Sequence, residues 1–591
     1  MKFYPSLIAS AVSFAVVLSG QAAANVPDAG SLQRELDQRQ AQQKVKPSGE
    51  WFNQAAKAPY TATDGQELTF PLTQVQVFDW TNQEISTPEL APILANYVGK
   101  AVSLTDLSNL ANEITEFYRS HNYLVAKAIL PPQEIEQGKV KILLFKGNVG
   151  EVRLQNQSAL SDKFVARLAN TTVNGSEFIL KDELEKFALT MNDVPGVNTG
   201  LELSAGKQAG EANLLIKLQN AERFSGYVSA DNQGNKNTGR YRLATGIKAN
   251  NLIGWGDELK VDLMSSNNSN LKNARLDYSS LIDGYATRLG LTANYLDYEL
   301  GGNFKALQSQ GHTHSIGAYV LHPTIRLPDF RLNTKVSFNH QGLTDKQQAV
   351  NVAQKRQVNS LTVGINGSWN SLKDGTSYFS LSALFGNLAN HTNEQAHYVA
   401  TDFQPKSRFT VYQYSLSHEQ ALPKSFAFNL GVNGQFADKT LDSSQKMLLG
   451  GLYGVRGHQA GVASVDEGHL VQTELKHYLP LFSKSLLTSS VFYDYGWGKY
   501  YKHSGFLARG VNNSVKLQSI GAGLSLSEAG SYAIFLARGV NNSVKLQSIG
   551  AGLSLSEAGS YAINASVAKP LGKKIENADK HQFWFSAIKT F

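Results

Sequence analysis

From about residue 223 to the C-terminus, apolar and polar residues alternate with a period of two. Alternation places successive side chains on opposite faces of a β-strand, so one face suits lipid and the other suits water. In lipid every backbone polar group must be paired within the protein, and strands of this kind therefore have to close into a barrel. The pattern predicts a mainly β chain in which residues 222–591 form an antiparallel transmembrane β-barrel. Two clear runs carry on one face Tyr285, Thr287, Leu289, Leu291, Ala293 and Tyr295, and Phe426, Phe428, Leu430, Val432 and Phe436.

Composition agrees with this interpretation and excludes several other classes. The 591 residues include 50 Gly, 24 Tyr and 28 Phe, and only 17% are charged, which is typical of a membrane barrel with a polar lumen. There is no cysteine, which excludes disulfides and cysteine-ligated metal. The net charge of +7 is spread along the chain and gives no indication of nucleic-acid binding.

The N-terminal part contains three short segments. Residues 1–24 have a positive start, an apolar stretch and a small-residue end, which predicts a secretory signal peptide. Within residues 25–45, the stretch 31–44 has strong helix formers, but only Leu32 and Leu36 could form an apolar stripe. A helix that is polar nearly all round either lies loose in solvent or occupies a wet cavity. Residues 46–68 are rich in Pro, Gly and small residues and are expected to form a linker.

Two small α+β domains are expected between the linker and the barrel. Residues 69–147 give the order strand, helix, helix, strand, strand. A cap at Ser103 with Asp106 starts the longer helix of this domain. Residues 148–221 repeat the same order, with a loop at residues 192–196 after the second helix.

A segment near the C-terminus occurs twice without a change. Residues 506–534 are identical to residues 535–563, and each copy is 29 residues long. Solenoid repeats drift in sequence and need more units, so this repeat indicates a recent duplication or an assembly error of the sequence. With strands of about ten residues, the barrel has about 16 strands without the second copy and about 18 with it. We expect one copy to loop out, because two extra strands would disturb the contacts around Asp494.

One glycine-rich stretch and one later strand are expected to meet. Residues 450–457 lie on a long loop, 438–467, and carry a single basic residue, Arg456. In the strand that follows, alternation puts Phe492, Asp494 and Gly496 on the lumen face. A carboxylate in a crowded lumen needs a partner, and a guanidinium offers two parallel hydrogen bonds. On the residues alone, a solvated arginine and a separate lumen charge remain an alternative.

Five short motifs, taken in order, resemble those of the outer-membrane transporters of two-partner secretion (TpsB-type), which belong to the POTRA-barrel superfamily. Residues 118–133 resemble the first POTRA domain, residues 192–197 the second, and residues 231–234 the entry into the first barrel strand. The loop motif usually written Val-Arg-Gly-Tyr is matched by Gly454, Val455, Arg456, Gly457 and His458, with a histidine in the last position. The partner motif Phe-x-Asp-x-Gly is matched by Phe492, Asp494 and Gly496.

The resemblance implies a pore in the outer membrane of a Gram-negative bacterium, with the POTRA domains in the periplasm. Its partner would be a secreted exoprotein (a haemolysin, an adhesin or a contact-dependent inhibition toxin) recognised through its N-terminal secretion domain. The polar N-terminal helix would be the plug of the resting pore. Other expected partners are outer-membrane lipid and, through the aromatic last strand ending at Phe591, the barrel-assembly machinery. The POTRA residues expected to bind the exoprotein are Tyr118, Tyr123, Pro131, Pro132, Gln133, Asn192, Pro195 and Gly196.

No enzyme, cofactor or metal site is expected. The chain has neither a phosphate-binding Gly-Lys-Ser/Thr loop nor a Gly-x-Ser-x-Gly elbow. His312 and His314 are two imidazoles with no nearby acid or thiol, which makes a poor metal site. Two other functions stay open: an assembly factor that inserts barrel proteins, which usually carries more POTRA domains, and a passive porin or nutrient receptor, which would need no periplasmic receptor domains.

Overall fold

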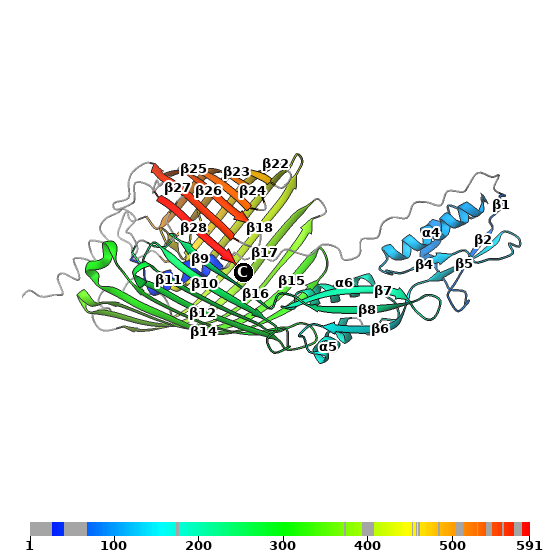
Figure 1. Ribbon diagram of the computed structural model, residues 1–591, viewed down its shortest axis with the longest axis horizontal. Helices are drawn as coiled ribbons and strands as arrows, with labels where there is room; N and C mark the ends of the chain where they lie inside the picture. The colour runs from blue at the N-terminus through cyan, green and yellow to red at the C-terminus, as the bar shows by residue number, and fades with distance from the viewer. Residues whose placement is uncertain are drawn as a thin grey trace, which may run out of the picture.

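The computed structural model describes residues 26–40, 68–172, 176–232, 234–235, 237–371, 374–392, 407–451, 453–456, 458, 461–482, 485–503, 512–528, 530–538, 547–557, 561–571 and 582–591. The proposed signal peptide and linker lie outside these residues, apart from residue 68. Figure 1 shows a large barrel with two small domains that extend from one of its ends. Among the helices in the described ranges, none is long and apolar enough to cross a membrane.

The first small domain is built on a helix with a strong N-terminal signal. Helix α4 begins after Ser103, whose side chain accepts from the Asp106 backbone N–H while Asp106 bonds back to Ser103, a reciprocal capping box. The apolar face of α4 covers a three-stranded sheet in the order β2-β5-β4. The elements are β1 (Phe70–Pro71), β2 (Gln74–Phe78), η1 (Pro88–Leu90), α3 (Ala91–Leu94), β3 (Ala101–Val102), α4 (Leu104–Ser120), β4 (Lys127–Ile129) and β5 (Lys139–Phe145).

The second small domain repeats this plan. Its sheet has the order β6-β8-β7, in which β6 is parallel and β7 antiparallel to β8. Both helices lie on one face of the sheet and bury Phe187, Leu168 and Met191 completely. The elements are β6 (Asn148–Gln157), α5 (Asp162–Thr172), α6 (Lys181–Asn192), β7 (Val197–Ala205) and β8 (Glu211–Asn220).

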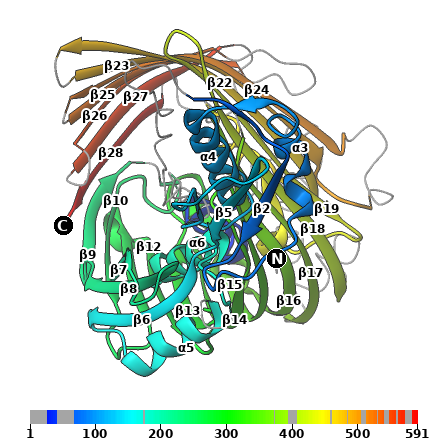
Figure 2. The same ribbon diagram turned by 90° about the vertical axis from the view of Figure 1, so that its right-hand side faces the viewer.

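The rest of the chain forms a closed antiparallel barrel of 18 strands. The last strand, β28, pairs with the first, β9, so the ring closes without a free edge (Figures 1 and 2). The strands are β9 (Phe224–Asp231), β10 (Arg242–Asn250), β11 (Glu258–Ser266), β12 (Leu271–Leu281), β13 (Arg288–Glu299), β14 (Ser309–Arg326), β15 (Phe330–Gln347), β16 (Val352–Ser371), β17 (Gly375–Thr392), β18 (Arg408–Leu422), β19 (Phe426–Ala437), β22 (Glu467–Phe482), β23 (Ser485–Lys499), β24 (Ser514–Glu528), β25 (Gly530–Arg538), β26 (Gln547–Glu557), β27 (Tyr561–Leu571) and β28 (Gln582–Thr590). Short 3₁₀ turns between strands are η2 (Asn267–Ser269), η3 (Gly302–Leu307) and η4 (Gln348–Val350).

The expectation that one copy of the repeat loops out is wrong. Strands β25 and β26 are the two additional strands, and both are members of the ring. Strand β25 pairs with β24 at nine positions but with β26 at only two, and β26 pairs with β27 at eleven. The pairing of β24 with β23 is complete from Leu486 to Lys499, so the wall next to Asp494 is not disturbed. The gain of two strands preserves the even number needed for antiparallel closure.

The alternation predicted from the sequence is present in the barrel wall. Outward-facing apolar side chains include Leu291 (55% exposed) and Val491 (54% exposed), whereas Asp494 on the opposite face is fully buried. Thr287 departs from the pattern: it is buried and bonds the His322 ring. Asp231, the first residue of the 231–234 motif, is the last residue of β9 and does not lie at its start, because the strand already begins at Phe224.

A helix and a long loop fill part of the barrel interior. Helix α2 (Ala29–Gln40) is two residues longer at its start than the predicted stretch, because Asp28 caps it and accepts from the Ser31 backbone N–H at 2.8 Å. Leu32 and Leu36 are buried against an apolar cluster of the barrel wall. The loop between β19 and β22 contains η5 (Ser443–Gln445), β20 (Met447–Leu448) and β21 (Ser464–Val465). The polar helix therefore lies in a cavity of the barrel. This is one of the two positions that its sequence allowed, the other being loose in solvent.

Candidate functional site: the loop and the plug in the barrel lumen

The inward-folded loop meets the barrel wall at one arginine. The Arg456 guanidinium donates from Nε to Asp494 Oδ2 at 2.9 Å and from Nη2 to Asp494 Oδ1 at 2.8 Å. The Arg456 backbone N–H also donates to Asp494 Oδ2 at 2.9 Å. Glu474 lies 3.7 Å from Nη1. Since the Asp494 side chain is fully buried, this two-pronged pair is the arrangement that a buried carboxylate needs.

The other two residues of the wall motif have complementary roles. The Phe492 ring lies under the Arg456 guanidinium, with 3.7 Å between the ring centroid and Cζ, so the cation is stacked as well as paired. Gly496 leaves room for Val455, because a Cβ at Gly496 would lie 2.8 Å from Val455 Cγ2. Phe492, Asp494 and Gly496 thus provide a stack, an anion and a gap for the same loop tip.

The remaining loop residues fix its conformation. A Cβ at Gly454 would lie 2.3 Å from the Leu449 carbonyl oxygen, so only glycine fits there. His458 is buried, and its Nε2 lies 3.1 Å from the Gln518 carbonyl oxygen of β24. Burial lowers the pKa of His458, and its contact with that carbonyl offsets only part of the effect. Gly457 lies outside the described residues.

A second arginine, which the sequence did not single out, joins the helix, the loop and the wall. Arg356 on β16 bonds Asp442 of the loop at 2.6 Å, Asp28 of the helix at 3.2 Å and Asp345 of β15. The Ser443 hydroxyl also donates to Asp28, at 2.6 Å. Burial pushes the pKa of Asp28 up, but the Arg356 charge and the bonds from Ser443 and Ser31 hold that pKa below its usual range.

Further polar contacts along helix α2 bind it to the inward-folded loop and to the barrel wall. Arg34 donates to the Lys446 carbonyl oxygen of the loop at 3.2 Å, and Asn294 of the wall donates to Gln33 at 2.7 Å. Asp37 lies 3.7 Å from the Arg275 guanidinium of β12. The helix is therefore held by polar groups along its length, which suits an element that rests in a wet lumen.

The POTRA residues predicted to bind a partner protein occupy several kinds of position. Tyr118 is only 3% exposed and its hydroxyl donates to Glu89 at 2.6 Å, so it is a core residue and not a contact surface. Tyr123 packs edge-on against Phe178 at the junction of the two small domains. Pro131 is half-buried and Pro132 exposed. The Gln133 amide bonds both backbone groups of Lys141 and so continues the sheet where β4 ends.

The predicted loop of the second small domain lies against the barrel. Asn192 accepts from the Thr199 backbone N–H at 3.2 Å. Gly196 has φ +78°, and a Cβ there would lie 3.0 Å from the Asn250 Cβ of the barrel, which is a tight contact. Asn192, Pro195 and Gly196 all line a cavity between this domain and the barrel. The structure therefore places these residues at the mouth of the pore.

No cluster of three or more metal-ligating side chains is present among the residues that the structure describes. His312 and His314 lie two residues apart on β14. Tyr295 of β13 stacks on the His312 ring, while the His314 ring fills the space beside Gly342 of β15.

The barrel, the inward loop, the helix in the lumen and the two small domains together define a class. These are the features of an outer-membrane transporter of two-partner secretion, in which POTRA domains precede a pore. Residues 210–526 match the family model described as haemolysin secretion/activation protein ShlB/FhaC/HecB, and residues 70–147 match the POTRA domain, ShlB-type. The chain belongs to this family.

Similar proteins agree with this assignment. The chain is 72% identical over 594 residues to a protein of Haemophilus influenzae (strain 86-028NP) called heme/hemopexin transporter protein HuxB, and the match covers 100% of both chains. It is 22% identical to the outer membrane transporter CdiB of Dickeya dadantii, over 75% of this chain and 78% of the relative. The solved structure of CdiB from Escherichia coli superposes with a TM-score of 0.64 at 18% identity and covers 100% of both chains.

The protein is thus a two-partner secretion pore of the outer membrane, with its POTRA domains in the periplasm, and it acts with a secreted exoprotein. The family members to which it is similar are transporters.

Proposed function

We propose that this pore secretes one large exoprotein, and that the cell uses this exoprotein to obtain haem, free or bound to hemopexin. The observation that carries the proposal is the 72% identity, over the full length of both chains, to a protein named as a heme/hemopexin transporter. This class of cargo is narrower than the range that the motifs alone allow, which includes haemolysins, adhesins and contact-dependent inhibition toxins.

The two POTRA domains would capture the N-terminal secretion domain of the exoprotein. Their sheets support capture by strand addition, because β4 and β7 are outer strands of their three-stranded sheets and an outer strand can pair with an extended peptide. In the first domain the outer strands β2 and β4 have five and three residues, whereas in the second the outer strands β6 and β7 have ten and nine. We therefore favour the second domain as the main capture site. Within it we favour β7, which pairs with β8 in regular register, whereas the pairing of β6 with β8 has a bulge and bulges weaken an edge for strand addition.

The Arg456–Asp494 contact would hold the loop in a conformation that transport requires. Its support is the geometry of one fully buried carboxylate that receives three hydrogen bonds from one loop residue. Helix α2 would be the plug that occupies the resting lumen.

The test is deletion of the gene, followed by quantification of large secreted proteins in the medium and of growth with haem–hemopexin as the haem source. We expect one exoprotein to disappear from the medium and growth to fail, and a plasmid copy to restore both. If every large exoprotein stays at its normal level in the medium, secretion is not the function. If one exoprotein is lost but growth is unchanged, the pore is correct and the cargo class is wrong.

Capture is tested with purified protein. A fragment of the exoprotein N-terminal domain is mixed with transporters that carry a photo-reactive residue at Leu201 of β7 or at the exposed Ile129 of β4. We expect cross-linking at Leu201 to exceed that at Ile129, and a transporter that captures the fragment at neither position would contradict the receptor role.

A further inference from the structure

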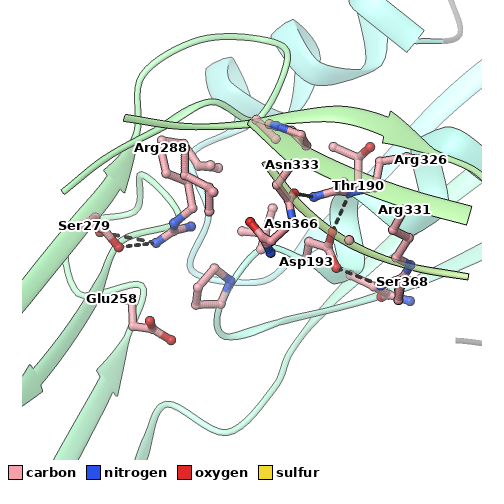
Figure 3. Close-up of a pocket in the computed structure, with 18 of the residues that line it drawn as sticks. Thr190, Asp193, Glu258, Ser279, Arg288, Arg326, Arg331, Asn333, Asn366 and Ser368 are labelled. Atoms are coloured by element: carbon pink, nitrogen blue, oxygen red, sulfur yellow. Dashed lines mark hydrogen bonds and ion pairs between the residues drawn. The ribbon is translucent and has the colours of Figure 1, made fainter. Parts of the chain in front are cut away.

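The mouth of the pore contains a cavity of about 960 Å³ between the second POTRA domain and the barrel. One side is formed by the loop from Asn192 to Asn198 and the other by the ends of strands β10 to β18. Figure 3 shows that Asp193, Arg326 and Arg331 meet on one side of this space, with Arg288 and Glu258 across from them. A polypeptide that passes from the POTRA domains into the lumen has to cross this region.

The charged side chains that line the cavity are mostly cationic. There are five cations, Lys248, Lys260, Arg288, Arg326 and Arg331, and two anions, Asp193 and Glu258. Glu258 bonds both lysines, at 2.7 Å to Lys248 and 2.5 Å to Lys260. A cavity with low-dielectric walls and an excess of one charge concentrates the opposite charge.

The three arginines are held by different partners. Arg288 donates to the Gly256 carbonyl at 3.0 Å and to the Ser279 hydroxyl at 2.9 Å, and within the described part of the chain no carboxylate forms an ion pair with it. Arg326 and Arg331 share one carboxylate, Asp193, at 2.8 Å and 3.4 Å. The arginine side chains are 9% and 11% exposed, whereas that of Asp193 is 33% exposed.

Asp193 is in an unusual place for an acid. It is the C-cap residue of α6, where the helix dipole disfavours a negative charge. Its position is explained by the two buried guanidinium groups of the barrel, which would repel each other without an anion between them. The anion comes from the POTRA domain and the cations from the barrel, so the contact exists only while the domain rests on the barrel mouth.

We propose that the Arg326–Arg331 pair is a binding site for carboxylate side chains of the secreted polypeptide, and that Asp193 occupies it in the resting pore. An acidic stretch of an extended polypeptide is the partner that the charge of the cavity fits. When such a stretch enters, its carboxylates replace Asp193 on the two arginines, and the POTRA loop is released from the rim. That the bound polypeptide is the exoprotein rests on the proposed function. The binding of carboxylates to Arg326 and Arg331 does not depend on it.

The test measures binding of two labelled synthetic peptides to the purified full-length transporter in detergent at low salt. One peptide alternates aspartate with serine, and the other has asparagine in place of aspartate. We expect Asp193→Asn to bind the acidic peptide about tenfold more tightly than the wild type, because one charge-assisted competitor is gone. Asp182→Asn, at the exposed start of the same helix, makes the same change in net charge and should leave binding as in the wild type.

A second variant, Asp193→Asn with Arg326→Gln, should lose the gain, whereas Asp193→Asn with Arg326→Lys should keep part of it. Heat-shifted electrophoretic mobility checks that each barrel is folded. Equal binding by the wild type and Asp193→Asn, or equal binding of the two peptides, would overturn the proposal. Because the assay contains no exoprotein, its failure leaves the secretion experiment unaffected, and failure of secretion leaves this result unaffected.

Discussion

The contact of Arg456 with Asp494 predicts a graded response to substitution. Lysine at position 456 keeps the charge but cannot form the two-pronged pair, so it loses one charge-assisted hydrogen bond of about 1.5–3 kcal/mol. It also loses the flat stacking on Phe492, a loss of about 1 kcal/mol. Alanine leaves the buried Asp494 charge without its main partner, at a cost of about 3–5 kcal/mol.

Each loss applies to docking of the loop and not to folding of the barrel, whose strands are paired independently of Arg456. With about 1.4 kcal/mol per tenfold change, Arg456→Lys should reduce the docked population on the order of a hundredfold, and Arg456→Ala should reduce it further. The expected order of exoprotein secretion is wild type, then Arg456→Lys, then Arg456→Ala.

The assay is the amount of exoprotein in the medium for each variant, with heat-shifted mobility of the barrel as the check on folding. Lys499→Ala is the matched control, since that lysine ends the same strand as Asp494 and its side chain is 60% exposed. Secretion by Arg456→Lys at the wild-type level would refute the geometric part of the reasoning. Secretion by Arg456→Ala at that level would refute the role of the contact.

Three further predictions follow from the same region. Gly496→Ala should reduce secretion, because the added Cβ would lie 2.8 Å from Val455 and overpacking costs about 1–3 kcal/mol. Gly431→Ala is the control and should leave secretion unchanged, because the nearest neighbours of its Cβ lie at 3.7 Å; the amount of exoprotein in the medium is measured for both variants. Deletion of residues 535–563 should leave a folded, secreting barrel of smaller conductance in bilayer recordings, because one copy of each hairpin sequence remains. Because the pKa of buried His458 is lowered, docking should be strongest above about pH 6.5 and weaken as pH falls towards the lowered value, and His458→Tyr should remove this dependence of secretion on pH.

The alternation of residues was enough to predict the face of Asp494, and the loop motif then identified Arg456 as its partner. This worked because strand periodicity is strict, so that a lumen position can be assigned from sequence alone. The same reasoning could not find Arg356. Its three acidic partners, Asp28, Asp345 and Asp442, come from three separate segments, and no local pattern connects them.

Two errors have definite physical reasons. Looping out of the repeat was expected on the assumption that added strands would displace the neighbours of Asp494. The structure inserts β25 and β26 after β24, which keeps its full pairing with β23. Tyr118 was taken for a binding residue because it lies in a family motif, but that stretch is largely a folding motif. Its helix face packs on the sheet, and burial of Tyr118 follows from the helical period that predicted the helix.

Arg356 and Asp494 together hold the long loop at two places. Asp494 binds the tip through Arg456, and Arg356 binds the start of the loop through Asp442. Arg356 also binds Asp28 of helix α2, so one guanidinium serves three carboxylates. Three like charges around one cation repel each other, but the lowered pKa of Asp28 means that the attraction of Arg356 and the bonds from Ser443 and Ser31 outweigh that repulsion. Departure of helix α2 would therefore cost these contacts, while Asp442 and Asp345 would remain on Arg356 and the loop would keep both of its anchors.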